Sequence, residues 1–374
     1  MSQKICVYAI CKNELKFIDK WLENMSEADY IVVLDTGSTD GTFEKLQQDP
    51  RVTRVEQEVI TPWRFDVARN RSMDLIPDDA DILVCTDFDE LFEPGWGQYL
   101  RDNWVPGYHN RCHYKYAWAH DPQGRPEFVF TYDKIHTRDF NWIFPVHEVL
   151  WPLNENEYVE TVLKAEENIY LHHWQDLTKN RASYLELLKL SCEENPNSSH
   201  VWSLLAREHL NNEDYEDSLQ VCLDTLDKPD IETVSNGLVL LQTLLFTSMN
   251  YFYLGNYEEA EWYCQEFIRV NPTYREPYFL LGSIYNEQRL YQLAEAMVFA
   301  GRKYGVQKYD WVELEKTWTT DDYSILGAVY LNMQNYEDAA QNLKQVINFE
   351  PENNAALKQY ILALENQLNK LAQK

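Results

Sequence analysis

Residues 81–91 read DILVCTDFDEL, an apolar run that ends in three carboxylates, Asp87, Asp89 and Glu90. A short continuous apolar run of this kind is typical of a strand buried on both faces of a parallel sheet. Acidic side chains at a strand end either contact solvent or supply oxygen ligands to a hard cation. The stretch therefore predicts an α/β fold, and the rest of the chain has to decide what the carboxylates do.

Strand and helix candidates alternate through the first half of the chain. Besides residues 81–85, apolar runs predict strands at 4–10, 30–34 and 51–55. Amphipathic spacing between them predicts helices at 14–22, 41–48 and 66–76. Such short alternating units indicate an α/β domain with a largely parallel sheet.

After about residue 180 the strands give way to a self-similar pattern. One set of matching positions recurs at spacings of 42, 34 and 45 residues, in the groups His209, Tyr215, Ser218; Tyr251, Tyr257, Ala260; Tyr285, Tyr291, Ala294; and Tyr330, Tyr336, Ala339. These residues resemble the tetratricopeptide repeat, a pair of antiparallel helices that stacks into a solenoid. An unrelated helical bundle is the alternative. We expect domains at 1–178 and 179–374, the second holding a peptide or protein or forming a homodimer.

The composition limits the class of partner. The chain has 33 Lys and Arg against 61 Asp and Glu, a formal net charge of −28. Nucleic acids and anionic membranes are excluded as partners because both require a basic surface. Seven scattered cysteines without a CxxC pair, no signal-like N-terminus and no apolar run long enough for a membrane span predict a cytoplasmic protein.

Two polar motifs follow the first predicted strands. Asn13 and Glu14 come directly after the strand at 4–10, and Asp35 closes the next strand ahead of TGSTDGT. In open α/β sheets ligands bind beyond the carboxyl ends of the strands, where the Asp35 carboxylate can accept hydrogen bonds from a ribose or base. The residues at 38–41 are better explained as a turn and a helix cap.

Further candidates lie in three later segments. Arg69 in PWRFDVARNRS can pair with a diphosphate or orient Asp87, although a surface ion pair explains it nearly as well. His147 and Glu148 in PVHE, and His172 in HHW, offer the base and the further metal ligand that a D-x-D site needs. D-x-D by itself is a weak motif in an acidic chain.

The order of CKNE, LDTGSTDGT, FDVARN and DFDE within residues 4–175 resembles the family 2 glycosyltransferases, which have the nucleotide-diphospho-sugar-binding fold called GT-A. HE, a later isolated histidine and tetratricopeptide-like helices resemble the bacterial enzymes that glycosylate bacteriocin peptides on cysteine or serine. Phe88 departs from the pattern, which usually has a shorter side chain between the aspartates.

The resemblance implies a role for each matching residue. Asp35 would contact the uridine, Arg69 would lie beside the diphosphate, and Asn13 and Glu14 would lie near the donor. Asp87 would contact the ribose or sugar and belong to the metal site, with Asp89 and His172 as the other ligands of Mn²⁺ or Mg²⁺. His147 and Glu148 would face the acceptor.

The expected activity is a metal-dependent, inverting transfer of a hexose from a UDP-sugar to a Ser, Thr or Cys side chain. Glu148 is the first candidate for the base, His147 the second, and Glu90 a rival because it lies near the D-x-D motif. Two other functions stay open. One is transfer to a glycan or another non-protein acceptor, and the other is a repeat scaffold that binds a nucleotide sugar without transferring it.

Overall fold

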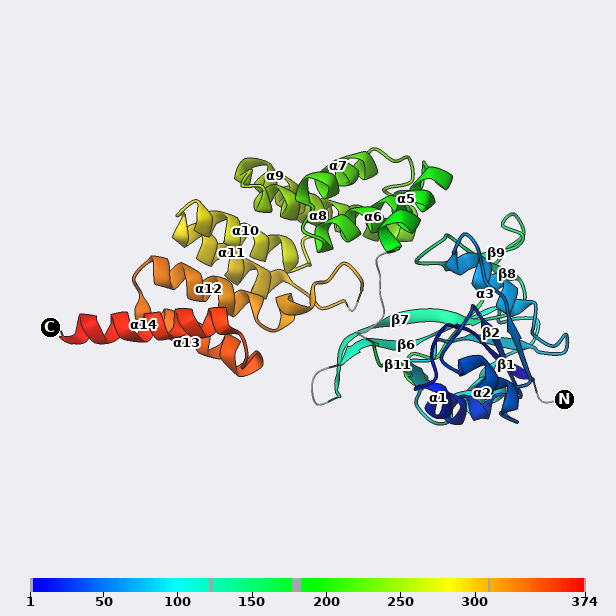
Figure 1. Ribbon diagram of the computed structural model, residues 1–374. Helices are drawn as coiled ribbons and strands as arrows, with labels where there is room; N and C mark the ends of the chain where they lie inside the picture. Colours follow the sequence, from blue (N-terminus) through cyan, green and yellow to red (C-terminus); the bar gives the residue numbers. More distant parts are fainter. Residues whose placement is uncertain (1–2, 121–123, 177–182, 309, 373–374) are drawn as a thin grey trace. The chain divides into compact units, whose positions relative to one another are not determined.

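The computed structural model describes residues 3–120, 124–176, 183–308 and 310–372. The chain divides into two compact units, Met1–Ser191 and Cys192–Lys374. Every strand of the described residues lies in the first unit, whereas the second is helical (Figure 1). The division falls later than the boundary at 178 and 179 that the sequence pattern suggested.

The first unit is built on one mixed sheet with the order β3-β2-β1-β4-β7-β6-β11-β5, in which β10 pairs with β6. β1 to β4 are parallel to one another, whereas β7 is antiparallel to both β4 and β6. The predicted parallel arrangement therefore holds for this half of the sheet. The strands are β1 (Ile5–Cys11), β2 (Tyr30–Asp35), β3 (Arg54–Gln57), β4 (Ile82–Cys85), β5 (Glu90–Phe92), β6 (Arg111–His120), β7 (Pro126–His136), β10 (Val162–Lys164) and β11 (Tyr170–His173).

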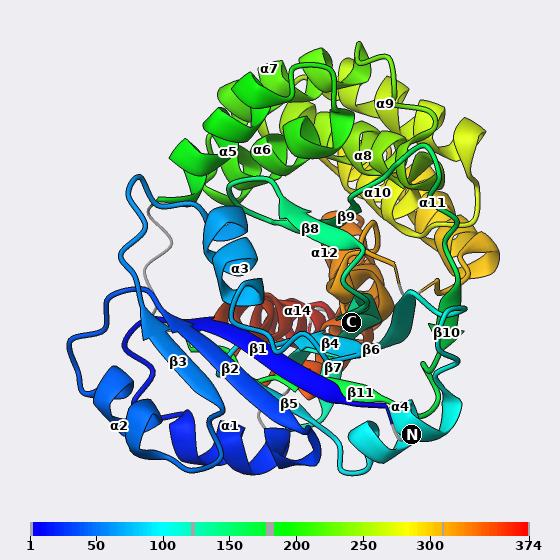
Figure 2. The ribbon, with the colours of Figure 1, turned by 90° about the vertical axis from the view of Figure 1, so that its right-hand side faces the viewer.

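Helices cover both faces of the parallel strands, as Figure 2 shows. α1 (Ile18–Asn24), α2 (Thr42–Gln48) and α4 (Trp96–Asn103) pack on the face that presents alternate β1 side chains such as Val7. The residues after α3 (Phe65–Met73) and the separate hairpin β8 (Phe140–Ile143) and β9 (Val149–Pro152) pack on the face that presents Tyr8. Burial on both faces explains why these strands are almost continuously apolar.

The parallel register brings the predicted motifs to one edge of the sheet. Cys11 at the end of β1 lies opposite Asp35 at the end of β2, and β4 pairs with the other side of β1. Because parallel strands share a direction, the segments that follow them emerge together. This edge is the expected position of a ligand site in an open α/β sheet.

The sequence pattern did not predict the long antiparallel hairpin β6–β7, which joins the parallel strands to the rest of the sheet. Cys112, Tyr114 and Tyr116 are buried and alternate with His113 and Lys115, as expected of a strand with one buried face. Polar residues at every second position break the apolar run, so the segment lacks the signal that identified β1, β2 and β4.

The second unit repeats one helical hairpin. Tyr215, Tyr257, Tyr291 and Tyr336 are the first residues of α7, α9, α11 and α13, and the small residue three positions on is buried in every copy. The residue two positions before each tyrosine has a positive φ. The helices from the end of the first unit onward are α5 (Tyr184–Glu194), α6 (Ser199–Asn211), α7 (Tyr215–Leu226), α8 (Leu238–Tyr253), α9 (Tyr257–Val270), α10 (Glu276–Glu287), α11 (Tyr291–Tyr304), α12 (Asp321–Asn332), α13 (Tyr336–Phe349) and α14 (Asn354–Ala372).

The unequal spacing of the repeats corresponds to two insertions. One separates α7 from α8, and the other separates α11 from α12 and contains the short 3₁₀ helix η3 (Glu315–Trp318). Among the residues that the structure describes, no helix has the length and apolar character needed to cross a bilayer. All seven cysteines are buried with free thiols.

A glycine lets α12 and α13 approach closely. A Cβ atom built on Gly327 would lie 2.8 Å from Cγ and Cδ2 of Leu343, closer than carbon atoms normally approach. We predict that Gly327→Val lowers the free energy of unfolding by about 1–3 kcal/mol through overpacking. Urea denaturation followed by circular dichroism measures the change. Gln341→Val, at an exposed position of α13, is the control and should cost less than about 1 kcal/mol. Equal losses would contradict close packing as the cause.

Candidate functional site

The Asp35 carboxylate is buried and holds the turn that follows β2. Its Oδ1 accepts hydrogen bonds from the backbone N–H groups of Gly37 (2.9 Å) and Ser38 (2.8 Å) and from Gln57 Nε2 (2.9 Å). Burial alone would raise the pKa of Asp35, but the hydrogen bonds from Ser38, Gln57 and Gly37 outweigh it and lower the pKa. A permanent carboxylate therefore shapes the loop at this edge.

Asn13 and Glu14 tie the loop after β1 to the loop after β2. Asn13 has a φ of 60° and its Oδ1 accepts a hydrogen bond from Thr39 N at 2.8 Å, while its own N–H donates to Ser38 Oγ at 2.8 Å. The Glu14 N–H donates to Thr42 Oγ1 at 2.9 Å. The two motifs thus form one connected surface.

Arg69 connects the D-x-D segment to the HE segment. Its Nη2 lies 2.8 Å from Asp87 Oδ1, and its Nε donates to Glu148 Oε1 at 3.0 Å. The guanidinium is only 3% exposed. Burial would lower the pKa of Arg69, but the carboxylates Asp87 and Glu148 together with Cys85 raise it well above its usual value. Arg69 is therefore in direct contact with two other predicted site residues, Asp87 and Glu148. Arg69 and Glu148 are 79 positions apart along the chain.

Glu90 is part of a buried network. Its Oε1 accepts hydrogen bonds from Tyr116 Oη (2.8 Å) and Lys134 Nζ (3.0 Å), and its Oε2 accepts one from Asp87 N (2.9 Å). At 1% exposure the carboxylate has no surface on which to meet an incoming hydroxyl or thiol. The structure thus gives this rival base a supporting position beneath Asp87.

Lys134, on β7, is a site residue that the sequence pattern missed. Its ammonium lies 3.6 Å from Asp87 Oδ2 and is buried beside Glu90. Burial would lower the pKa of Lys134, but Glu90, Tyr132 and Asp87 outweigh it and raise the pKa. An isolated lysine in the aromatic strand TYDKIH was the available signal. Asp87 therefore lies between two cationic side chains, Arg69 and Lys134.

The D-x-D segment meets β11 through the second histidine of HHW. His173 Nε2 lies 3.7 Å from Asp89 Oδ2, whereas His172 contacts His120 Nε2 at 2.9 Å and Glu93 Oε1 at 3.4 Å. Adjacent residues of a strand point to opposite faces, so only one of the two histidines can face Asp89. The predicted set Asp87, Asp89 and His172 is not assembled; within the described part of the chain no three His, Cys, Asp or Glu side chains form a metal-binding group.

His147 lies beside Glu148 in a turn with a φ of 51°, and its ring contacts Tyr184 edge-on at a centroid distance of 6.0 Å. Trp142, on β8, is buried beneath Arg69. Its Nε1 donates to Tyr8 Oη at 2.9 Å, which in turn pairs with His136 Nε2 at 2.6 Å. Trp142, Tyr8 and His136 therefore form a buried layer that packs against Arg69.

The comparisons with known proteins concern the helical unit. Residues 323–353 match the tetratricopeptide repeat family. The second unit consists of tetratricopeptide-like repeats. No curated protein matches the chain.

Three similar solved structures are of low identity to this chain. A thermophilic tetratricopeptide protein of Thermus thermophilus is 19% identical, with 49% of this chain and 90% of that chain covered and a TM-score of 0.38. The MamA protein is 20% identical, covering 45% and 82% with a TM-score of 0.34. YrrB, described as having an unusual peptide-binding site, is 15% identical, covering 47% and 81% with a TM-score of 0.34.

Removal of the buried Lys134 ammonium tests the network that it forms with Glu90 and Asp87. We predict that Lys134→Met lowers the free energy of unfolding by about 3–5 kcal/mol, because Glu90 is left buried without its cation. Urea denaturation measures the loss, and the double variant with Glu90→Gln should recover part of it. Lys115→Met, which removes a half-exposed pair with Glu167, is the control and should cost about 0–1 kcal/mol. A similar loss in both single variants would refute the network.

Burial lowers the pKa of His136 to about 3, so the ring stays neutral in the folded protein over the usual pH range. The unfolded chain takes up a proton near pH 6.5, so stability is complete above that pH and falls as the pH drops toward 3. Between pH 6.5 and 5 we expect this group to cost about 2 kcal/mol. Denaturation of the protein and of His136→Gln at both values measures it: the variant should lose less stability on acidification. Parallel losses would contradict the assignment.

Proposed function

We propose that this protein transfers a hexose from a UDP-sugar to a Ser, Thr or Cys side chain of a peptide or protein. The observation that carries the proposal is the double contact of Arg69, which joins Asp87 and Glu148 at the carboxyl edge of the parallel strands. Donor chemistry and acceptor chemistry must meet within a few ångströms, and this buried guanidinium connects the two segments assigned to them. The GT-A resemblance of the sequence motifs is consistent with that arrangement.

A divalent cation fits the residues beside Asp89. The 3.7 Å between Asp89 Oδ2 and His173 Nε2 exceeds a hydrogen bond, and His173 Nδ1 is buried without a hydrogen-bond partner in the described residues. Mn²⁺ or Mg²⁺ accepts one or two protein ligands and completes its shell with phosphate oxygens and water. Asp89 and His173 would hold the ion, which when bound would neutralise charge on the leaving diphosphate.

Side chains of the protein would orient the donor and accept the acceptor's proton. Arg69 and Lys134 hold the Asp87 carboxylate in one orientation, where it can accept hydrogen bonds from donor hydroxyls. Arg69 bonds to Oε1 of Glu148, and in the described residues no partner contacts Oε2, so this oxygen can accept the acceptor's proton. The acceptor oxygen or sulfur then bonds to the anomeric carbon as the bond to UDP breaks, which inverts its configuration.

Two other functions compete with this proposal. A glycan or another non-protein acceptor would use the same donor chemistry. A nucleotide-sugar-binding scaffold would bind the donor without releasing UDP. Measuring UDP release and peptide modification in parallel distinguishes both of these functions from the proposed one.

Turnover in the presence of Mn²⁺ tests the donor site. We predict that UDP-glucose, UDP-galactose or a UDP-N-acetylhexosamine releases UDP, and that chelation abolishes the release. His173→Ala should reduce the release at least about 100-fold, whereas His172→Ala, on the opposite face of the same strand, should retain most of it. No binding of any donor, or the reverse order of the two histidine variants, would contradict the proposal.

Replacement of the base separates chemistry from binding. Glu148→Gln keeps the shape and the Arg69 contact but cannot take a proton. We expect transfer to fall about 100-fold or more, with donor affinity by calorimetry unchanged. Glu155→Gln, an exposed carboxylate in the same region, is the control and should behave as the parent protein. Unchanged turnover in Glu148→Gln would remove this residue from the mechanism.

A further inference from the structure

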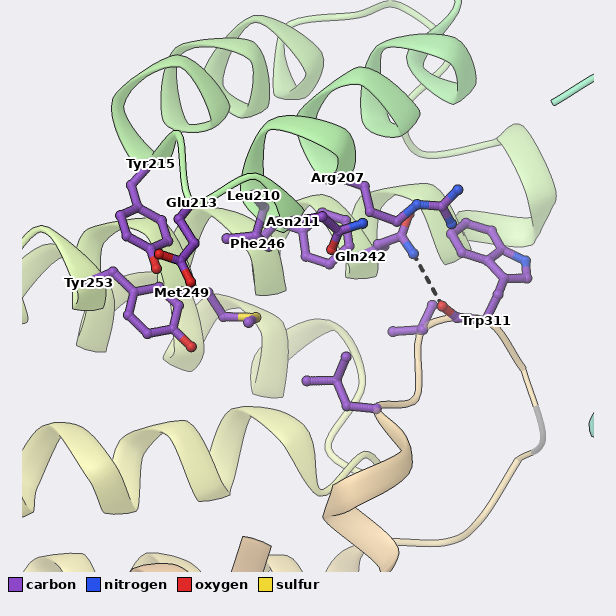
Figure 3. Close-up of a pocket in the computed structure, with 12 residues that line it drawn as sticks. Arg207, Leu210, Asn211, Glu213, Tyr215, Gln242, Phe246, Met249, Tyr253 and Trp311 are labelled. Atoms are coloured by element: carbon purple, nitrogen blue, oxygen red, sulfur yellow. Dashed lines mark hydrogen bonds between the residues drawn. The ribbon is translucent and has the colours of Figure 1, made fainter. Parts of the chain in front are cut away.

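The helical unit contains a groove that its repeat pattern alone does not explain. Its cavity volume is about 330 Å³, and it lies between α6, α8 and the segment before η3 (Figure 3). Apolar side chains line the groove, namely Leu210, Phe246, Met249, Val312 and Leu314, and Figure 3 shows Leu210 and Phe246 between Tyr253 and Arg207. An apolar side chain of a peptide can enter there and lose its contact with water.

The insertion that closes the groove is held in place. Gln242 Nε2 donates to the carbonyl of Trp311 at 3.1 Å, and the buried Glu276 carboxylate accepts hydrogen bonds from Leu314 N (3.0 Å) and Thr317 Oγ1 (2.9 Å). Tyr274 Oη also donates to Asp310 at 2.5 Å. Because the wall is already ordered, a ligand has little of it to organise on binding.

One end of the groove combines aromatic rings with a carboxylate. The rings of Tyr215 and Tyr253 stack with a centroid distance of 4.7 Å and an interplanar angle of 22°, and Figure 3 shows Glu213 beside them. The Glu213 carboxylate is exposed and has no ion-pair partner in the described residues. Burial raises the pKa of Tyr253, and the carboxylates of Asp321 and Glu213 add to the effect. This end of the groove favours a cation.

Only this repeat places an acidic side chain at the corresponding turn. Glu213 has a φ of 62°, and the equivalent positions of the later turns, also with positive φ, hold Gly255, Arg289 and Gln334. At the opposite end of the groove Figure 3 shows Arg207 near Trp311. A positive residue of a ligand is therefore attracted to the end of the groove that holds Glu213.

We propose that this groove binds the acceptor as a peptide segment in which an apolar residue adjoins a lysine or arginine. The apolar side chain occupies the middle of the groove, and the cation lies against Tyr215, Tyr253 and Glu213. Residues 192–374 carry 13 Lys and Arg against 28 Asp and Glu, a formal net charge of −15, so the unit as a whole attracts a basic segment. The choice of a peptide rests on the proposed function.

A pair of labelled peptides tests the site on the full chain. Fluorescence anisotropy is measured with a capped nonapeptide that carries Leu-Lys at its centre and with the same peptide carrying Leu-Glu. We expect the lysine peptide to bind at least about tenfold more tightly. Equal binding, or tighter binding of the glutamate peptide, would overturn the proposal.

Four variants locate the binding. Glu213→Gln and Tyr253→Ala should each weaken the lysine peptide about five- to tenfold, whereas Tyr253→Phe should bind as the parent protein. Glutamine is accepted at this backbone position, since Gln334 occupies its equivalent. Glu287→Gln removes an exposed carboxylate outside the groove and should have no effect. If Glu213→Gln weakens binding no more than Glu287→Gln, the carboxylate is not part of the site and the proposal fails.

Turnover measurements test the proposed transferase activity and the proposed peptide-binding groove independently of each other. UDP release with no preference for the lysine peptide would leave the transferase intact and refute the groove as the acceptor site. Preference for the lysine peptide with neither donor binding nor UDP release would support a peptide-binding groove and refute the transferase.

Discussion

The buried guanidinium of Arg69 is the interaction on which the arrangement of the candidate site depends. Its two carboxylate partners, Asp87 and Glu148, belong to segments that are far apart in the sequence, and both would otherwise face the same edge as like charges. A buried cation is stable only when anions surround it, and the cation in turn holds each anion in place. The charge network therefore fixes geometry at a place where an acidic protein would tend to repel a phosphorylated ligand.

The same principle extends below the surface of the site. Lys134 pairs with Glu90 and lies near Asp87, while the aromatic hairpin β6–β7 removes these charges from water. Their interaction is stronger in such an environment than on the surface. The hairpin β6–β7 thus supports the site at the ends of the parallel strands. Glu90 helps to position the segment that holds Asp87, because its carboxylate accepts a hydrogen bond from the Asp87 N–H.

The helical unit depends instead on close helix–helix packing that is repeated in every hairpin. A small buried residue such as Ala260 in every hairpin allows close approach, and a left-handed turn before each tyrosine reverses the chain. The repeats differ in their insertions and in side chains such as Glu213, whose equivalents are Gly255, Arg289 and Gln334. The segment that contains Trp311 is one such insertion, and it converts a regular helical surface into a groove with distinct ends.

Local signals determined much of this protein from its sequence. Apolar runs identified β1, β2 and β4, and the repeat spacing identified the tyrosine that begins helix α9 and its equivalents, because both depend on neighbours along the chain. Only the tertiary structure decided that His173 rather than His172 faces Asp89, and that Lys134 joins the site. Those contacts depend on strand register and long-range pairing, and a shift of one residue along a strand reverses the face on which each side chain lies.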